Sequence, residues 1–256
     1  MPLFAFPLNR SSRLVRDSRL EHRFPKGEPD VPMPNAPIEP PRWISFDCYG
    51  TLIDWERGVL RAFRELAHLR EEDAAELFPT WERIQWEMLQ GPYLPYAEIL
   101  QTSFFQTINT LGYRCGGYAA EAFVDSLARW EPFPDVNPAL IRLSQRYKLA
   151  VISNIDRRLL GGSLRHLAVR FDALITAEDA RQYNPSPEVF RYTFEKLNCT
   201  PRDIVYVAFG SEADLEAAAS AGVRVIYLDR GAPLGETKVA VEAAIKNLDE
   251  LISFWN

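Results

Sequence analysis

The stretch Trp43–Trp55, which reads Trp-Ile-Ser-Phe-Asp-Cys-Tyr-Gly-Thr-Leu-Ile-Asp-Trp, constrains the fold of this chain more than any other. Its first four residues, Trp43–Phe46, form a short apolar run that predicts a buried strand. Asp47 follows at the carboxyl end of that run, where open parallel sheets place their ligands. Gly50 and Thr51 then predict a sharp turn. A carboxylate in this position suits a nucleophile, although a single Asp could also serve only to cap the turn.

Residues 46–54 fit the pattern Phe-Asp-x-Tyr-Gly-Thr-Leu-x-Asp, which resembles the first motif of the haloacid dehalogenase (HAD) superfamily. The chain looks most similar to the L-2-haloacid dehalogenase branch, over residues 41 to about 254. This resemblance implies an α/β fold, a doubly wound parallel sheet (the HAD-like core) with an inserted all-helical cap, and Asp47 as the nucleophile. Phosphatases of the superfamily usually carry a second Asp two residues after the nucleophile. Tyr49 occupies that position here.

The bulk composition limits the classes of partner. The net charge of −6 does not indicate a nucleic-acid-binding protein, because such proteins usually carry an excess of Lys and Arg. No apolar run reaches the length of a membrane span. The three cysteines lack metal-ligand spacing and fit a reduced, cytoplasmic protein. We therefore expect a small-molecule substrate as the partner, no nucleic acid and no membrane, while a homodimer remains an open alternative.

The chain divides into three parts by its sequence pattern. Residues 1–41 are rich in Pro and Arg and predict an extended or disordered arm, with an organelle-targeting segment or a packing arm as alternatives. Residues 56–133 carry helical spacing and predict the cap. Residues 42–55 and 134–256 predict the core. In that core the pattern indicates strands at 149–153, 173–176, 204–208 and 223–228, helices between them, and a last helix near 239–254.

Aromatic side chains are concentrated between residues 81 and 96. They either pack between helices or line a pocket, and we expect a mixture in which Trp86, Tyr93 and Tyr96 face the ligand. In the dehalogenases an Arg of the cap receives the departing halide. When Trp81-Glu82-Arg83 is aligned with the segment that carries this Arg in the dehalogenases, Glu82 occupies its position. Arg83 is one residue further along, so we expect its side chain to point about 100° away around the helix and to be a poor substitute.

Two further motifs follow strands of the core. Ser153 and Asn154 end the run Leu-Ala-Val-Ile-Ser-Asn, where a hydroxyl and an amide can bind a carboxylate or phosphate oxygen or cap the next helix. The resemblance implies that they hold a substrate carboxylate. The third motif reads Tyr-Asn-Pro-Ser-Pro, so Asn184 stands where relatives carry a Lys that pairs with the nucleophile. An amide can still hydrogen-bond Asp47 but brings no charge, so we expect Asp47 to be more easily protonated.

The fourth motif covers residues 206–214 and carries Phe209, Ser211 and Asp214. Asp214 matches the last acid of the family, Phe209 stands where a polar residue is expected, and Ser211 replaces an Asn that helps to position water. Metal-dependent members hold Mg²⁺ with acids of this loop. Because only Asp47, Glu212 and Asp214 could do so here, with Phe209 intruding, we expect no cofactor and no metal, and Mg²⁺ stays an alternative.

Together these motifs predict Asp47, Thr51, Asn184 and Asp214 as catalytic residues. The predicted substrate-binding residues are Tyr49, Ser153, Asn154, Trp86, Tyr93, Tyr96, Phe209 and Ser211. The missing Lys and Arg favour an enzyme repurposed for lyase, isomerase or cyclase chemistry on a small carboxylated or carbonyl metabolite of specialised metabolism. A conventional hydrolase with Asp47 as nucleophile and a non-catalytic binding protein are the two alternatives.

Overall fold

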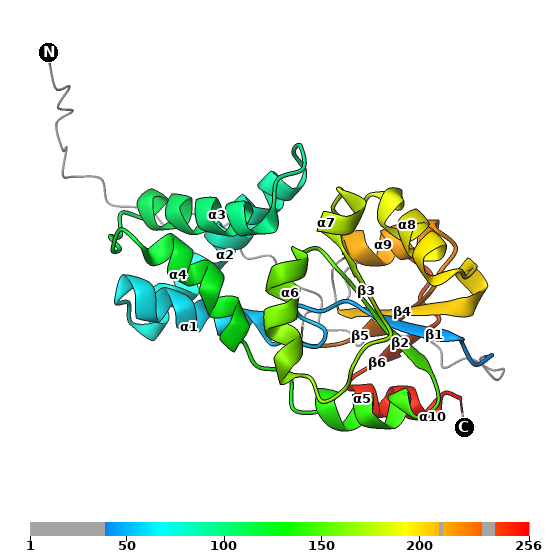
Figure 1. Cartoon of the computed structure of the whole chain (residues 1–256). Coiled ribbons are helices and arrows are strands. Elements are labelled where there is room, and N and C mark those ends of the chain that lie inside the picture. The colour runs from blue at the N-terminus through cyan, green and yellow to red at the C-terminus, as the bar shows by residue number, and fades with distance from the viewer. Residues whose placement is uncertain (1–38, 210–211, 232–238, 256) are drawn as a thin grey trace, which may run out of the picture. The chain divides into compact units, whose positions relative to one another are not determined.

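The computed structural model describes residues 39–209, 212–231 and 239–255, with side chains for all of these except Glu212 and Ala213 (Figure 1). Its centre is a parallel sheet of six strands in the order β3-β2-β1-β4-β5-β6. The strands are β1 (Trp43–Phe46), β2 (Lys148–Ser153), β3 (Ala173–Thr176), β4 (Ile204–Phe209), β5 (Arg224–Leu228) and β6 (Ala243–Ile245). The strand order reverses beside β1, as in other doubly wound folds, so the end of β1 is the expected place for a ligand. The α/β fold class is confirmed.

The prediction of the last helix was wrong. Residues 239–242 are not helical, residues Ala243–Ile245 form strand β6, and helix α10 covers only Leu248–Ser253. Ala243 and Ile245 are buried, and both take part in a parallel register with β5. Tertiary pairing with β5 therefore outweighs the weak helical pattern of this stretch. The short helix α7 (Ala177–Ala180) was also not predicted.

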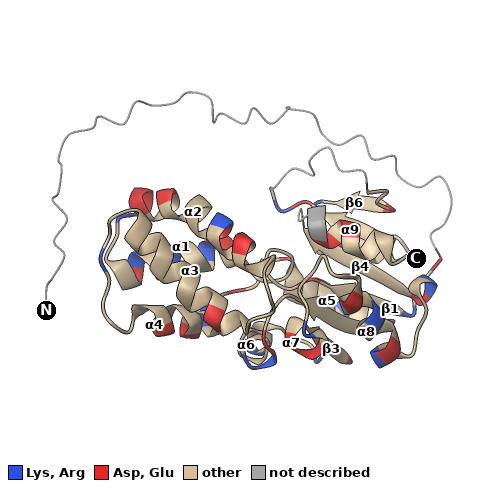
Figure 2. Ribbon diagram, turned by 90° about the horizontal axis from the view of Figure 1, so that it is seen from above, with Lys and Arg blue, Asp and Glu red and all other residues tan. Residues whose placement is uncertain are grey.

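Alternation along the strands builds two apolar layers. Ile44 and Phe46 of β1 face one layer, while Trp43 faces the other. The first layer is covered by α5 (Val136–Ser144), α6 (Arg157–Ser163) and α10, and the second by α8 (Pro187–Leu197) and α9 (Glu212–Ser220). Figure 1 shows α5 and α10 together on one side of the sheet, with α8 and α9 on the other. Strand β4 carries no charged residue and is entirely tan in Figure 2, as burial on both faces requires.

Four helices connect β1 to α5 and are called the helical insert below. They are α1 (Trp55–Ala67), α2 (Glu71–Leu89), α3 (Tyr96–Thr110) and α4 (Ala119–Ser126). Aromatic rings from all four pack together: the centroid of Phe63 lies 5.2 Å from that of Phe104, and Phe104 lies 4.8 Å from Phe123. Trp81 of α2 is fully buried among them. Most of the aromatic content of the insert thus forms its core.

No helix in the described ranges is both long enough and apolar enough to cross a membrane. The arm predicted for residues 1–41 lies outside the described residues except for its last three positions. Its separate role, and the division into cap and core, stay predictions.

Candidate active site

The ends of three neighbouring strands converge on one cavity. Asp47 follows β1, Ser153 ends β2 and is followed by Asn154, and Phe209 ends β4. The cavity has a volume of about 480 Å³, enough for a small organic molecule. Its described core residues are Asp47, Tyr49, Ser153, Asn154, Phe209 and Asp214. The sheet edge therefore brings together six of the residues that the sequence singled out.

Asp47 is held by the turn that follows it. The Thr51 hydroxyl donates a hydrogen bond of 2.9 Å to Asp47 Oδ2 and accepts one of 3.0 Å from the backbone N–H of Phe209. Thr51 is fully buried and Asp47 is 7% exposed. Gly50 makes this turn with φ +93°, and a Cβ on it would lie 2.2 Å from the Phe209 ring. Only glycine fits this crowded, left-handed position, so the turn and the ring fix one another.

The pKa of Asp47 is raised well above its ordinary value. Burial is the main cause, and the nearby Asp214 carboxylate is the second. The hydrogen bonds from Thr51 and from the Cys48 backbone act in the opposite direction and do not compensate. No Lys or Arg of the described residues contributes to the shift. The pKa of Asp47 is raised, which is the direction we expected from the missing motif Lys.

Asn184 does not contact Asp47. Its backbone N–H donates to Asn154 Oδ1 at 2.8 Å, and Asn154 lines the cavity. Its side chain is buried, and its Oδ1 has no hydrogen-bond partner in the described part of the chain. The expectation that the amide still hydrogen-bonds Asp47 was therefore wrong. Asn184 does not line the cavity, and its printed hydrogen bond is to Asn154, which does.

One stripe of α2 forms the opposite wall. Its lining residues follow helical spacing: positions 82 and 83 lie three and four residues after position 79, positions 85 and 86 lie three and four after position 82, and position 89 lies four after position 85. All six positions therefore share a face of the helix. The insert contributes Trp55, Pro79, Glu82, Arg83, Gln85, Trp86, Leu89 and Tyr96 to the lining. Sequence reasoning named Trp86 and Tyr96 but missed Trp55, Pro79, Gln85 and Leu89. The helical spacing from Glu82 would have indicated Gln85 and Leu89.

Carboxylates outnumber cations in the described lining of the whole cavity, where Asp47, Glu82 and Asp214 face a single Arg. Arg83 is the only Lys or Arg in the described lining, and its guanidinium is paired with Glu87 one turn away at 2.6 Å. Glu82 has no hydrogen bond or ion pair to any described residue, and partial burial, followed by the Glu56 carboxylate, raises its pKa. Figure 2 shows residues of both charges along α2. Both Glu82 and Arg83 reach the cavity, so Arg83 is not excluded from it by the turn of the helix.

Hydrogen bonds hold the insert against the core at this cavity. Asp156, which precedes α6, accepts bonds of 2.8 Å from the backbone N–H groups of Tyr96 and Ala97 at the start of α3. The Tyr96 hydroxyl in turn donates to Gln85 Oε1 of α2. Burial raises the pKa of Tyr96, so its hydroxyl stays protonated at neutral pH and acts as a donor.

Two predicted binding residues have other positions. Tyr93 does not line the cavity but stacks on Tyr183, with ring centroids 5.4 Å apart, beside a neighbouring hollow. Ser211 lies outside the described residues. Within the described ranges no group of three or more His, Cys, Asp or Glu side chains could hold a metal ion. Asp47 and Asp214 alone make an incomplete donor set, so the residues described do not fit Mg²⁺, and the absence of a cofactor stays a prediction.

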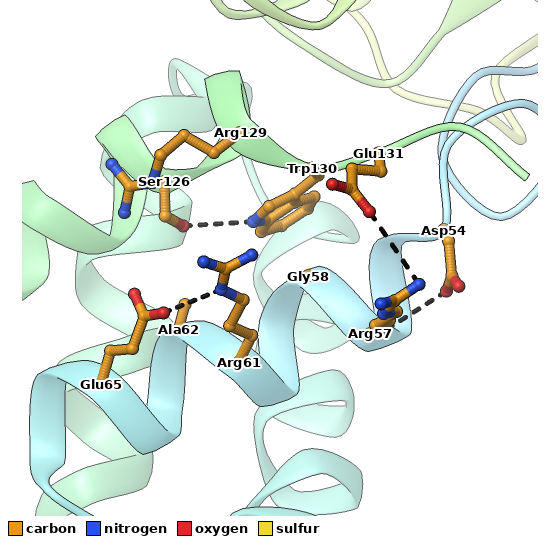
Figure 3. A pocket seen from close by; sticks show the side chains of 10 residues that line it. All are labelled: Asp54, Arg57, Gly58, Arg61, Ala62, Glu65, Ser126, Arg129, Trp130 and Glu131. Atoms are coloured by element: carbon orange, nitrogen blue, oxygen red, sulfur yellow. Dashed lines mark hydrogen bonds and ion pairs between the residues drawn. The ribbon is translucent and has the colours of Figure 1, made fainter. Parts of the chain in front are cut away.

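A second cavity lies beside α1, away from the strand ends, and has a volume of only about 30 Å³ (Figure 3). Its charged groups are largely paired with each other. Arg61 donates to Glu65 at 2.8 Å, and Arg57 lies 3.9 Å from Glu131. This hollow has room for about one water molecule, and it is not a substrate site.

The comparisons with known proteins agree with this arrangement. A family model described as "haloacid dehalogenase-like hydrolase" matches residues 41–222. Haloacetate dehalogenase H-2 of Moraxella sp. (strain B) is 28% identical, over 73% of this chain and 85% of the relative. Human N-acylneuraminate-9-phosphatase is 27% identical, over 72% of this chain and 80% of the relative.

Among solved structures, the L-2-haloacid dehalogenase of Xanthobacter autotrophicus with chloropropionic acid covalently bound superposes with a TM-score of 0.73. It is 21% identical, and the match covers 84% of this chain and 98% of that one. This likeness shows the fold alone. The family model spans most of the chain, and residues 41–222 include all four motif segments. The chain therefore belongs to the haloacid dehalogenase-like hydrolase family.

Proposed function

We propose that this protein is an enzyme in which Asp47 acts in its protonated form, as a general acid or hydrogen-bond donor, in non-hydrolytic chemistry on a small carbonyl-bearing metabolite. The reaction class is that of a lyase, isomerase or cyclase. The observation that carries the proposal is the environment of Asp47. Its only side-chain hydrogen-bond partner in the described chain is Thr51, and its charged neighbour is the Asp214 carboxylate rather than a cation.

The chemistry follows from this environment. A nucleophilic carboxylate must be ionised, and burial beside Asp214 disfavours the ionised form. A carboxyl group whose pKa is raised keeps its proton to higher pH and can instead give it to a carbonyl or hydroxyl oxygen. Ser153 and the Asn154 amide also line the cavity and can donate to the same ligand. A carboxylated substrate is less well supported, because the only described cation of the lining is paired with Glu87.

Hydrolysis by an Asp47 nucleophile is the second candidate. Family membership and the names of the relatives favour it, and Asp47, Thr51, Ser153 and Asn154 retain the family pattern. For this reaction Asp47 would attack carbon, displace a leaving group and form an ester that water then cleaves. The leaving anion would meet Glu82 in the lining, and no described cation lies beside Asp47 to keep it ionised.

The test exposes the protein to a panel of 2-haloacids and small phosphate esters, with and without EDTA. Free halide, free phosphate and the intact protein mass are measured for wild type, Asp47→Asn and Asn184→Lys. The proposal predicts no turnover and no covalent adduct for the wild type. Halide release together with an adduct on Asp47 that Asn184→Lys accelerates would establish hydrolysis and overturn the proposal.

The Asp47→Asn variant separates catalysis from binding once a lyase, isomerase or cyclase substrate is found. Asn has the shape of Asp and can donate a hydrogen bond, but it cannot transfer a proton. We expect substrate affinity to change little and turnover to fall by about 10²-fold or more, as for loss of a general acid. A ligand that binds equally to both variants, and that neither variant transforms, would indicate a non-catalytic binding protein. We further propose that the enzyme needs no metal and is cytoplasmic, and size-exclusion chromatography tests the alternative of a homodimer.

A further inference from the structure

We propose that the cavity beside Asp47 selects a substrate that carries an ammonium group or another organic cation next to its carbonyl or hydroxyl group. The inference deepens the proposed function and rests on it, because it concerns the same cavity. It differs from the substrates named for the relatives above, which are haloacids and a phosphorylated sugar acid. Three independent features of the lining support it: its charges, its aromatic rings and its unpaired polar groups.

The first feature is the balance of charge. Glu82 and Asp214 line the cavity together with Asp47, which is protonated in the proposed function, and Glu56 lies close enough to Glu82 to raise its pKa. Against these acids stands Arg83, whose charge is balanced by the ion pair with Glu87. Glu82 has no cationic partner in the described chain. A ligand with a positive charge would supply the missing partner, whereas a carboxylate or phosphate would be repelled.

The second feature is the aromatic wall. Tyr49, Trp55, Trp86, Tyr96 and Phe209 all contribute to the described lining. The faces of such rings attract cations, and aromatic cages recognise organic ammonium groups in this way. Trp86 is 41% exposed and lines the cavity, so part of its ring surface is available to a ligand. An inorganic cation would not use this wall, because a hard metal ion takes oxygen ligands.

The third feature shows that the cavity is built for a ligand, independently of its charge. Ser153 is only 5% exposed, lines the cavity, and its hydroxyl has no hydrogen-bond partner among the described residues. The Asn154 side chain accepts from Asn184 through its oxygen, which leaves its amide N–H groups for the cavity. Buried polar groups are normally satisfied, so the Ser153 hydroxyl indicates a ligand oxygen at this position, and the partly buried Asn154 amide can donate to the same oxygen. The substrate therefore combines a cationic group with a carbonyl or hydroxyl group.

The experiment compares three probes that share one aromatic body. They are 2-phenylethylammonium chloride, 2-phenylethanol and sodium 3-phenylpropanoate, titrated by calorimetry into the full-length protein at neutral pH. We expect the ammonium probe to bind about fivefold or more tighter than the alcohol, and the carboxylate to bind weakest. The ammonium preference should fall as NaCl is raised, because exposed carboxylates at the cavity mouth are screened.

Two variants of α2 serve as a matched pair. Glu82→Gln removes a lining carboxylate without changing its shape, and should reduce the affinity for the ammonium probe by about threefold to tenfold while leaving the alcohol unchanged. Glu76→Gln makes the same change of charge at an exposed position of the same helix that does not line the cavity. It should alter neither affinity.

Equal affinity for the three probes, tighter binding of the carboxylate, no binding of the ammonium probe, or equal effects of the two variants would overturn the inference. A heat signal from MgCl₂ alone, with none from the ammonium probe, would also overturn the inference. It would indicate that the carboxylates of the cavity bind a metal ion rather than an organic cation. None of these outcomes decides the proposed function, which depends on the Asp47→Asn and Asn184→Lys assays. Failure of those assays would leave the measured charge preference of the cavity intact.

Discussion

The Thr51 hydroxyl bridges Asp47 and the backbone of Phe209. It accepts a hydrogen bond from the Phe209 N–H at 3.0 Å and donates one to Asp47 Oδ2 at 2.9 Å. Because a backbone N–H can only donate, the hydroxyl proton is directed to Asp47, and Oδ2 must accept it. A protonated Asp47 therefore carries its proton on Oδ1. Thr51 thus decides which oxygen of Asp47 can serve as the acid.

Thr51→Val should lower stability and raise the pKa of Asp47 further. Valine keeps the volume of the buried side chain but leaves the Phe209 N–H without an acceptor, which costs about 1–3 kcal/mol. Urea unfolding at pH 7 measures the loss. Thr51→Ser is the control, since it retains the hydroxyl, and should recover most of the difference from Val. Equal stability of the Val and Ser variants would show that the bridge contributes nothing.

Asp47→Asn should increase stability at neutral pH. The folded-state pKa of Asp47 is raised above its unfolded value, so the folded protein binds the proton more tightly. The wild type therefore loses stability as pH rises from about 4, the ordinary pKa of Asp, through the folded pKa. The advantage of Asn should be absent below about pH 4 and grow with pH across that window.

Asp203→Asn is a control for which we expect the opposite dependence of stability on pH. Hydrogen bonds from the Thr200 backbone and then its hydroxyl lower the pKa of Asp203, so its contribution is present above the unfolded pKa and disappears as pH falls. This variant should lose stability at neutral pH and match the wild type in acid. Urea midpoints between pH 3 and 8 check both signs. A wild type that gains stability with pH relative to Asp47→Asn would contradict the raised pKa.

Gly58 and Gly161 are both helical glycines, but alanine should have opposite effects at the two positions. A Cβ at Gly58 of α1 would lie 2.4 Å from the ring of Trp130, which is buried and donates to Ser126. The overpacking should cost about 1–3 kcal/mol despite the better helix propensity of Ala. At Gly161 of α6 a Cβ meets nothing within 4 Å, so Ala should add about 0.5–1 kcal/mol. Thermal unfolding of both variants measures the two changes in stability. A change of the same sign in both variants would contradict the prediction.

Arg230 contacts the turn that follows Asp47 through the backbone of Thr51. Its guanidinium donates to the Thr51 carbonyl and pairs with Asp135 at 2.8 Å, with both side chains largely buried. Arg230→Met should cost about 3 kcal/mol, because it leaves the Asp135 charge without its partner. The matched control is Arg142→Met, whose ion pair with Asp249 is half exposed and should contribute about 1 kcal/mol or less. Equal losses in chemical denaturation would show that burial of the first pair has no energetic consequence.

Short apolar runs made the sheet predictable. The bounds of β1 and β3 were predicted exactly, because each is a compact run of strand-forming residues next to a turn signal. Strand β6 was missed because three residues carry too little periodic signal, and its identity depends on pairing with β5. Helical spacing predicted that residues 56–133 are helical, but it did not define each helix of the insert, and no separate pattern indicated α4.

The core half of the site was predictable, and the insert half was predictable only in part, through Trp86 and Tyr96. Asp47, Ser153, Asn154 and Phe209 line one cavity because parallel strands end at one edge of the sheet. Which aromatic residues of the insert face the cavity depends on how the helices pack. Trp81 is buried in the core of the insert, whereas Trp86, five positions later on the same helix, reaches the cavity. Sequence spacing alone does not distinguish these two tryptophans.

The central claim is that burial, and then the Asp214 carboxylate, raise the pKa of Asp47, with no cation among the described residues to offset them. The most direct test is a ¹³C NMR titration of the Asp47 carboxyl carbon in the full-length protein, assigned by the loss of its signal in Asp47→Asn. The account predicts a midpoint well above the ordinary value of about 4, shifted downwards in Asn184→Lys, where an ammonium group is introduced behind the cavity wall. A wild-type midpoint at or below about 4 would mean that Asp47 is ionised at neutral pH and available as a nucleophile, which would contradict the account.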